Sequence, residues 1–381
     1  MKLKQLDEPI NLVVCQKSMI PMWMNHFNSY DDFKDFTTFD LTKQFAKFMT
    51  SNTKRIGIIN YELAFRRSEL LKLEDITLML DESSMIQNES AKRSKFVMKL
   101  NYKNLILLSG TPINGGKYER LWSQLHMLGL SMSKNLYWLS YVRTKTILKY
   151  GFPLKFVVGY KNVPHLKSTM KEYGCRFLKT SEVFDLPVKN FHTINVAPTK
   201  EYKTFTKDRI VKINDTELIG DTILTKLLYE RMLCGAYNPN KIAILKTLLE
   251  STEDRLIIFY NFDNELKAIE DLCYALDKPT SIVNGHEKDL RMYGDYNNSV
   301  TLIQYAAGSM GLNLQLANKM IYFTPPLNCE HWMQSAKRIN RIGQKNPCFY
   351  YKLVVKNSVE EKIYMALDRG EDFTNRLFVE W

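Results

Sequence analysis

Two adjacent carboxylates are the residues of this sequence that are best placed for chemistry. Asp81 and Glu82 follow an apolar run at residues 76–80, which puts them at the carboxyl end of a predicted buried strand. Open α/β sheets bind ligands at this end of their strands. In a nucleotide hydrolase the first carboxylate holds Mg²⁺, usually through water, and the second orients or deprotonates the attacking water. Taken alone, such a pair is weak evidence, because an acidic dipeptide at a strand end is more often a solvated turn.

A hydroxyl-bearing turn follows the next predicted strand, at residues 104–108. It consists of Ser109, Gly110, Thr111 and Pro112. Two hydroxyls at a strand end can sense a γ-phosphate or a nucleic-acid backbone, although the same four residues also make an ordinary turn. Because this turn comes after the acidic pair and after a strand of its own, we interpret its first three residues as nucleotide-binding or coupling residues.

A glycine-containing run in the second half of the chain, residues 306–314, follows a predicted strand that ends near Gln304. Gly308 and Gly311 would let a backbone approach a ligand closely, because glycine has no side chain. Asn313 lies in the same run. We interpret these three residues as part of a nucleotide or coupling site, and a simple turn is the alternative.

Two arginines follow between Gln334 and Gln344. Arg338 and Arg341 are three residues apart, so the spacing predicts that they share one face of a helix. Two guanidinium groups presented together can stabilise the charge that develops on a transferring phosphoryl group. A basic helix end is the alternative, but the flanking glutamines favour a functional segment.

Short apolar runs that alternate with amphipathic stretches must position these groups. This alternation is typical of α/β units with a parallel sheet, whose strands are buried on both faces. In the first half the predicted strands are residues 11–15, 55–60, 76–80 and 104–108. In the second half they are residues 255–259, 280–283, 299–304, 319–323 and 349–355, with helices at 265–276 and 330–340.

The alternation is interrupted twice. An aromatic and basic stretch with isolated glycines and prolines predicts a helical insertion at about residues 130–185, followed by a hinge. Residues 199–250 are predicted to form a mostly helical lead-in to the second half. We therefore expect two α/β lobes, at residues 1–190 and 191–381.

The composition restricts the partners and the compartment. The 381 residues include 53 Lys and Arg against 41 Asp and Glu, a net charge of +12, and the basic residues are spread along the chain. This balance favours nucleic acid over a membrane surface. Six well-separated cysteines and the lack of a long apolar run predict a reducing, intracellular setting without membrane insertion, either cytoplasmic or nuclear.

The ordered set of segments resembles motifs II, III, V and VI of superfamily two helicases in their Swi/Snf form. The four segments are residues 81–82, 109–112, 308–314 and 334–344. Residues 12–27, 60–62 and 256–262 are similar to motifs Ia, Ib and IV of the family, and residues 159–187 to the segment that leads out of its first lobe. The similarity covers nearly the whole chain.

This resemblance implies two RecA-like lobes that bind ATP in the cleft between them and grip double-stranded DNA along its backbone. By position, Asp81 and Glu82 would be the Mg²⁺ and water residues. The two arginines would be fingers from the second lobe, and Ser109 and Thr111 would couple hydrolysis to movement. The implied function is that of an ATP-dependent DNA translocase, a helicase-type hydrolase.

The sequence departs from the family at two places. No G-x-x-x-x-G-K-[ST] segment, the loop that cradles the β- and γ-phosphates, occurs in the 381 residues. Its strand would lie beside the one that ends at Ser109, so we expect an open sheet edge there, either filled by another polypeptide or left by truncation. Ser84 replaces the usual His of the family, which predicts a weaker link between the acidic pair and residues 109–112.

Two functions therefore remain open. One is a translocase that hydrolyses ATP poorly until a phosphate-binding loop is supplied from an upstream segment or a partner. The other is a non-catalytic DNA-binding scaffold that keeps the two-lobed shape. The retained Glu82, Arg338 and Arg341 favour the first function, and the missing loop favours the second.

Overall fold

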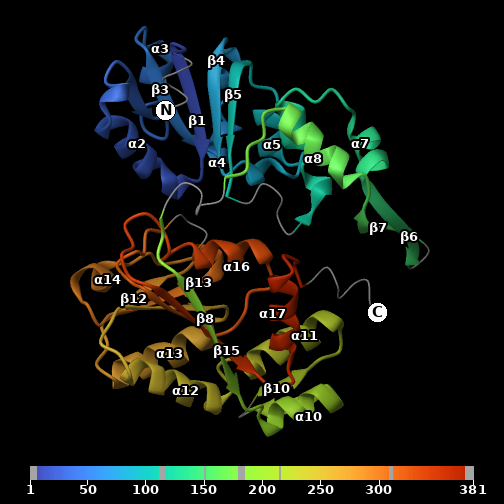
Figure 1. Cartoon of the computed structure of the whole chain (residues 1–381), viewed down its shortest axis with the longest axis vertical. Helices are drawn as coiled ribbons and strands as arrows, with labels where there is room; N and C mark the ends of the chain where they lie inside the picture. The colour runs from blue at the N-terminus through green and yellow to red at the C-terminus, as the bar shows by residue number, and fades with distance from the viewer. Residues whose placement is uncertain are drawn as a thin grey trace. The chain divides into compact units, whose positions relative to one another are not determined.

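Two parallel sheets organise the chain, one in each of two units. The computed structural model describes residues 7–110, 116–149, 152–178, 185–213, 216–308 and 312–373. The contacts between residues divide the chain into Met1–Phe177 and Leu178–Trp381, called unit 1 and unit 2 below (Figure 1). The division falls before the boundary that we expected at residue 190. No helix among the described residues is long and apolar enough to cross a membrane.

The sheet of unit 1 has five strands in the order β2-β3-β1-β4-β5, and every pair is parallel. The strands are β1 (Ile10–Cys15), β2 (Thr37–Asp40), β3 (Arg55–Asn60), β4 (Ile76–Asp81) and β5 (Tyr102–Leu108). Along β1, Leu12 and Val14 enter one apolar core while Val13 and Cys15 enter another. Burial on both faces explains the continuous apolar run and confirms the predicted parallel α/β class.

Helices cover both faces of this sheet (Figure 1). The core on one face includes residues of α2 (Ile20–Ser29), and the core on the other includes residues of α3 (Phe45–Thr50) and α5 (Lys92–Val97). The short helix α4 (Tyr61–Ala64) follows β3 directly. The acidic pair therefore leaves the sheet from a strand that is packed on both sides.

The second part of unit 1 differs from the predicted helical insertion. It has helices α6 (Trp122–Met127), α7 (Lys134–Tyr141) and α8 (Val163–Glu172), with an antiparallel hairpin of β6 (Val142–Lys149) and β7 (Phe152–Tyr160) before α8. The β-branched Val, Thr and Ile residues of β6 favour a strand, which explains the hairpin. The helices share a small apolar core of their own that contains Leu125, Tyr137, Tyr141 and Leu166.

The sheet of unit 2 has six parallel strands in the order β12-β13-β11-β14-β15-β8. They are β8 (Lys189–Val196), β11 (Leu256–Tyr260), β12 (Thr280–Val283), β13 (Val300–Gln304), β14 (Lys319–Tyr322) and β15 (Cys348–Val355). The helices are α10 (Lys200–Asp208), α11 (Ile223–Cys234), α12 (Pro239–Glu250), α13 (Asp263–Ala275), α14 (Arg291–Asp295), α15 (Tyr305–Gly308), α16 (Cys329–Ala336) and α17 (Val359–Asp368).

The lead-in to this sheet is mostly helical, as predicted, but contains one more hairpin. Strands β9 (Ile210–Ile213) and β10 (Thr216–Ile219) pair antiparallel between α10 and α11. Strand β8, which precedes the lead-in, lies at the edge of the sheet and pairs with β15 alone among the described strands. Most residues of β8 are exposed or half-buried, so it lacks the apolar run by which we predicted the central strands.

Candidate active site

The acidic pair lies where β4 ends. Asp81 is the last residue of β4, and Glu82 adopts a left-handed backbone with φ of 54° and ψ of 58°. For a residue with a side chain this conformation costs roughly 1–2 kcal/mol. The sharp turn ends the strand and separates the directions of the two carboxylates, so that each meets different partners.

Two serines hold the carboxylate of Glu82. The hydroxyl of Ser84 donates a hydrogen bond of 2.7 Å to Oε1 of Glu82, and the hydroxyl of Ser109 donates one of 2.8 Å to the same oxygen. Ser109 follows β5, the strand next to β4, so the sheet brings the two predicted segments together. We expected Ser84 to weaken the link between the acidic pair and residues 109–112. Its short hydroxyl instead reaches the carboxylate of Glu82 directly, so Ser84 takes part in this link.

The carboxylate of Asp81 has an aromatic partner. The indole Nε1 of Trp23 donates a hydrogen bond of 2.9 Å to Oδ2 of Asp81, and the hydroxyl of Tyr61 donates one of 2.9 Å to the backbone oxygen of Asp81. Burial raises the pKa of Asp81, the charge of Glu82 raises it further, and the bond from Trp23 opposes both effects. Asp81 is therefore an ionisable group in a partly dry setting, as metal-binding and proton-transfer groups commonly are.

Trp23 was not among the predicted site residues. It lies on α2, which follows β1, and β1 is the neighbour of β4 in the sheet. An aromatic residue shortly after a strand end is the one signal in the sequence, but the order of the strands is needed to place it beside Asp81.

The turn after β5 is described only in part. Ser109 is half-buried, Gly110 is an exposed bend residue, and Thr111 lies outside the described residues. Strand β5 pairs only with β4, so its other side is a sheet edge among the described strands. Leu108 on this strand is 38% exposed, which is unusual for an apolar side chain of a parallel sheet.

In unit 2 the structure brings the two predicted segments together. Nη1 of Arg341 donates a hydrogen bond of 3.1 Å to the backbone oxygen of Leu312, and the backbone N–H of Leu314 donates one of 3.2 Å to the backbone oxygen of Arg338. Asn313 lies between these two leucines with an exposed side chain. Gly308 is the last residue of α15, and Gly311 lies outside the described residues.

The predicted helical face for the two arginines is wrong. Helix α16 ends at Ala336, so Arg338 and Arg341 lie in the turns that follow it. Tertiary bonds replace helical ones here, since Nδ2 of Asn340 donates a hydrogen bond of 2.8 Å to the backbone oxygen of Pro187. Arg338 is only 9% exposed, and partial burial lowers the pKa of Arg341.

The two flanking glutamines have different surroundings. Nε2 of Gln344 donates to the backbone oxygens of Gln315 and Ala317, at 3.1 and 2.8 Å, and its Oε1 accepts from two backbone N–H groups. These bonds hold the segment before β14 against the arginine turn, so Gln344 is a positioning residue. Nε2 of Gln334 donates to Oε1 of Glu330 at 3.0 Å.

The donor set of unit 1 fits Mg²⁺ better than a transition metal. No group of three or more His, Cys, Asp or Glu side chains that could hold a metal occurs in the described part of the chain. Mg²⁺ is commonly bound by one or two carboxylates, with water and substrate phosphates completing its shell. Asp81 offers such a carboxylate, while the sequence contains no G-x-x-x-x-G-K-[ST] loop to cradle the phosphates themselves.

Two models of known protein families match the chain. Residues 2–240 match the model of the SNF2-related domain, which is more than half of the chain. The chain belongs to the SNF2-related domain family. Residues 240–343 match the model of the helicase conserved C-terminal domain, which covers the strands from β11 to β14 and the arginine turn.

Several curated relatives of this SNF2-related chain come from budding yeast. The ISWI chromatin-remodeling complex ATPase ISW1 of Saccharomyces cerevisiae is 24% identical, over 92% of this chain and 34% of the relative. The DNA repair and recombination protein RAD26 of the same yeast is 27% identical, over 92% of this chain and 36% of the relative. The chain thus spans about a third of the length of these relatives.

Among solved structures, the chain is similar to the SWI2/SNF2 ATPase core of Sulfolobus solfataricus in complex with dsDNA. The alignment covers 96% of this chain and 81% of the other, with 20% identity and a TM-score of 0.43.

Proposed function

We propose that this chain is the ATPase core of a DNA translocase, which hydrolyses ATP with Mg²⁺ and moves along double-stranded DNA. The observation that carries the proposal is the 2.8 Å hydrogen bond from Ser109 to Glu82, across the ends of the parallel strands β4 and β5. A carboxylate that is oriented in this way can act on an attacking water, and the turn that orients it adjoins the same strand ends. Membership of the SNF2-related family supports ATP as the nucleotide.

Several residues of the candidate site have a proposed role within this mechanism. Asp81 holds Mg²⁺ through water, and Trp23 positions its carboxylate. Glu82 orients or deprotonates the attacking water, and Ser109 transmits the state of the nucleotide to the chain. Arg341 contributes positive charge to the transition state; Mg²⁺ itself neutralises charge on the phosphates when bound.

The phosphates need donors that the 381 residues do not contain as a recognisable loop. We propose that a strand with its phosphate-binding loop pairs with the edge of β5, which is paired on one side only among the described strands. The strand comes either from residues before Met1 in a longer polypeptide or from a separate chain. Without it, ATP hydrolysis by these residues alone is weak.

The proposed partner is the backbone of duplex DNA. The net charge of +12 favours phosphates, and contacts to phosphates fix position without reading sequence. Binding is therefore independent of sequence and falls steeply as salt rises from about 50 to 200 mM. The proposed setting is intracellular, in the cytoplasm or the nucleus.

The missing loop also favours a second candidate, a DNA-binding scaffold that does not hydrolyse ATP. In that case the carboxylates and arginines would be remnants of an ancestral ATPase site. The two candidates share DNA binding and differ only in catalysis, so an assay of DNA-stimulated ATP hydrolysis separates them.

The experiment compares the 381-residue chain with the same chain fused to a phosphate-binding strand and loop before Met1. We expect DNA-stimulated turnover below about 1 s⁻¹ for the first and above it for the second. In the fused form, Glu82→Gln should lower kcat by at least about 10²-fold. The exposed Glu69 provides the control, and Glu69→Gln should leave kcat unchanged.

Two outcomes would change the proposal. A fused protein that folds and binds ATP and DNA without turning over would favour the scaffold. Full turnover by the 381-residue chain would contradict the need for an outside loop. In the active form, Arg341→Ala should lower kcat by about 10³-fold or more with little change in DNA affinity, as expected for an arginine finger.

A further inference from the structure

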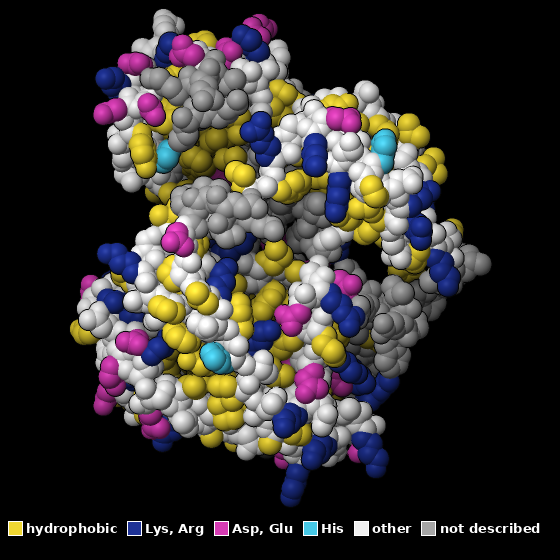
Figure 2. Space-filling model, viewed as in Figure 1, with side chains coloured by type: hydrophobic (Ala, Val, Ile, Leu, Met, Phe, Trp, Pro, Cys, Tyr) yellow, Lys and Arg dark blue, Asp and Glu magenta, His cyan; other side chains and the backbone are white. Residues whose placement is uncertain are grey.

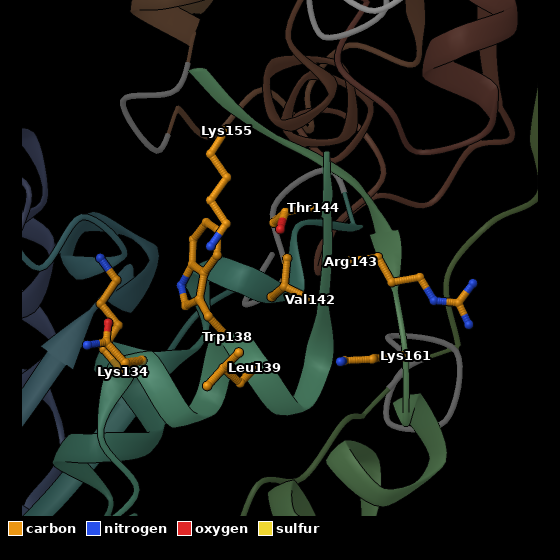
Figure 3. Close-up of a pocket in the computed structure, with 9 residues that line it drawn as sticks. Lys134, Trp138, Leu139, Val142, Arg143, Thr144, Lys155 and Lys161 are labelled. Atoms are coloured by element: carbon orange, nitrogen blue, oxygen red, sulfur yellow. The ribbon is translucent and has the colours of Figure 1, made fainter. Parts of the chain in front are cut away.

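A basic pocket lies in unit 1 away from the acidic pair, between α7 and the β6–β7 hairpin. Its volume is about 830 Å³, and its lining includes Lys134, Trp138, Thr144, Lys155 and Lys161. No carboxylate is among the described residues that line it. We call it the hairpin pocket. Figure 3 shows Lys155 reaching from β7 toward the indole of Trp138 on α7, while Arg143 extends to the other side of β6.

The surroundings of the hairpin pocket hold most of the excess positive charge of the chain. Residues 134–176 contain nine Lys or Arg residues and one Glu, which is +8 of the net +12. Figure 2 shows mainly Lys and Arg, and few Asp and Glu, over the part of unit 1 that carries α7, α8 and the hairpin. Such a concentration of one sign of charge attracts a polyanion.

Two of the pocket lysines have no carboxylate partner among the described residues. Lys134 forms an ion pair with Glu89, which neutralises part of its charge. No ion pair is formed by Lys155 or Lys161 within the part of the chain that the structure describes. Their positive charge is therefore available to a ligand phosphate.

Trp138 gives the hairpin pocket an aromatic wall. The Nζ atoms of Lys134 and Lys155 each lie 5.9 Å from the centre of its ring, within the range of cation–π attraction. The Nε1 of Trp138 is buried and has no acceptor among the described residues. A buried N–H without an acceptor is unfavourable, so an acceptor brought by a ligand would stabilise the occupied pocket.

We propose that the hairpin pocket binds an unpaired nucleotide of a nucleic-acid strand, with the base against Trp138 and the adjoining phosphates at Lys155 and Lys161. Aromatic side chains beside cations are the usual means of holding single strands, because every base has a face that can stack. A base within a duplex is stacked on its neighbours and cannot enter a pocket. A strand also uses the basic residues outside the pocket, such as Lys145, which a single free nucleotide cannot span.

The hairpin pocket is separate from the acidic pair, and single-strand binding there does not require that the chain hydrolyses ATP. Affinity is measured for an oligothymidine of about 20 nucleotides and for a duplex of equal length, by fluorescence anisotropy across a salt series. The variant Lys155→Glu/Lys161→Glu should lose about 10-fold or more in single-strand affinity, because it removes phosphate contacts and adds repulsion. Its duplex affinity should fall far less.

A matched control has the same net charge. Lys167→Glu/Lys171→Glu reverses two exposed lysines on α8, in the same unit but outside the pocket lining, and should change single-strand affinity little. Trp138→Leu keeps an apolar side chain in the small core and should lower single-strand affinity by about 5-fold or more through lost stacking. Equal losses in the pocket variant and the control variant would overturn the proposal.

A second measurement does not depend on a destabilising change. Leu139 lines the pocket and is 69% exposed, so a photo-crosslinking amino acid at this position should label the oligothymidine. The same amino acid at Leu224, which is 56% exposed in unit 2, should not. Crosslinking from both positions alike would contradict the pocket. Inorganic tripolyphosphate that competes as strongly as the oligothymidine, phosphate for phosphate, would show that the pocket takes free phosphates and not a strand.

Discussion

Charged side chains adjoin the ends of parallel strands in both units, but their surroundings are opposite. Asp81 and Glu82 are half-buried, and hydroxyl and indole donors hold them. In unit 2, Glu360 is fully buried and accepts two hydrogen bonds from Nζ of Lys241, at 2.6 and 2.8 Å, and one from the backbone of Val355. The first arrangement leaves carboxylates that a cation can approach. The second arrangement encloses the carboxylate of Glu360, so this ion pair stabilises the fold.

Glu265 is a second buried carboxylate of unit 2. Its Oε2 accepts from the backbone N–H of Asn261 at 2.8 Å and from the hydroxyl of Thr324 at 2.9 Å, while burial raises its pKa. These bonds join α13 to the ends of β11 and β14. The comparison teaches that a carboxylate near a strand end indicates a functional site only when its partners leave it open to solvent. The predictions below test that distinction.

The largest effect is expected from breaking the buried pair. Lys241→Met leaves the carboxylate of Glu360 without its cation and should lower the free energy of unfolding of unit 2 by about 3–5 kcal/mol. Lys246 on the same helix pairs with Glu250 at 3.8 Å with both side chains about half exposed, so Lys246→Met should cost less than about 1 kcal/mol. Urea denaturation followed by circular dichroism checks both values. If Lys241→Met costs as little stability as Lys246→Met, the buried pair does not stabilise the fold.

A smaller loss is expected at the close approach of α11 to Glu265. A Cβ atom added at Gly235 would lie 2.1 Å from Oε1 of Glu265, whose side chain is fixed by its hydrogen bonds. Gly235→Ala should therefore lower the free energy of unfolding by about 1–3 kcal/mol, as overpacking usually does. At Gly285 an added Cβ meets nothing within 4 Å, so Gly285→Ala is the control. The prediction fails if thermal unfolding midpoints of the two variants coincide.

Removing a charge at the open site should raise the free energy of unfolding, whereas breaking the buried pair should lower it. The folded-state pKa of Asp81 is raised, so ionisation at neutral pH destabilises the fold, and the penalty disappears as pH falls to the ordinary value of about 3.9. Asp81→Asn should therefore raise the free energy of unfolding by about 1 kcal/mol at pH 7. The gain should shrink toward pH 4.

Asp254 is a control because its pKa is shifted in the opposite direction to that of Asp81. Its hydrogen bond with Lys319 lowers its pKa, so its ionised form stabilises the fold above the ordinary pKa and Asp254→Asn should destabilise the chain at neutral pH. Parallel unfolding curves from pH 4 to 7 separate the two cases. A loss of stability in Asp81→Asn would mean that its carboxylate is a structural group after all.

The smallest effect is expected from one of the two serines at Glu82. Ser84→Ala removes one of the two hydrogen bonds that serines donate to Oε1 of the half-buried Glu82, so it should cost about 0.5–1 kcal/mol in stability of unit 1. Removing Ser109 as well should add a similar loss. Ser90→Ala, at an exposed position in the next turn, should be neutral. A loss of several kcal/mol in Ser84→Ala would place Glu82 with the buried structural carboxylates.

The central strands could be predicted from the sequence because burial on both faces leaves a continuous apolar run. The predicted strand at 55–60 coincides with β3, which is buried throughout and has a neighbouring strand on each side. The edge strands β2 and β8 could not be found in this way, since they are short or largely exposed. The β6–β7 hairpin was missed because lysines interrupt the apolar pattern of both strands.

The candidate site was predictable to a similar degree. Asp81, Glu82 and Ser109 follow recognisable strands, so their common edge of the sheet could be inferred. Trp23 lies 58 positions from its partner Asp81, and only the pairing of β1 with β4 makes them neighbours. Arg341 was expected on a helix, but α16 ends at Ala336 because the segment after it bonds to other parts of unit 2.

The sequence by itself determined the strand-end carboxylates, the excess of positive charge around the hairpin and the membership of the SNF2-related family, because these depend on residue order and local periodicity. Only the tertiary structure decided which carboxylates are open and which are enclosed. It also decided that Ser84 joins the link at Glu82 and that Trp138 shares a pocket with Lys155 and Lys161, which form no ion pair among the described residues. The reason is physical: burial and hydrogen-bond partners depend on which distant segments the fold brings into contact, and residue spacing does not encode that.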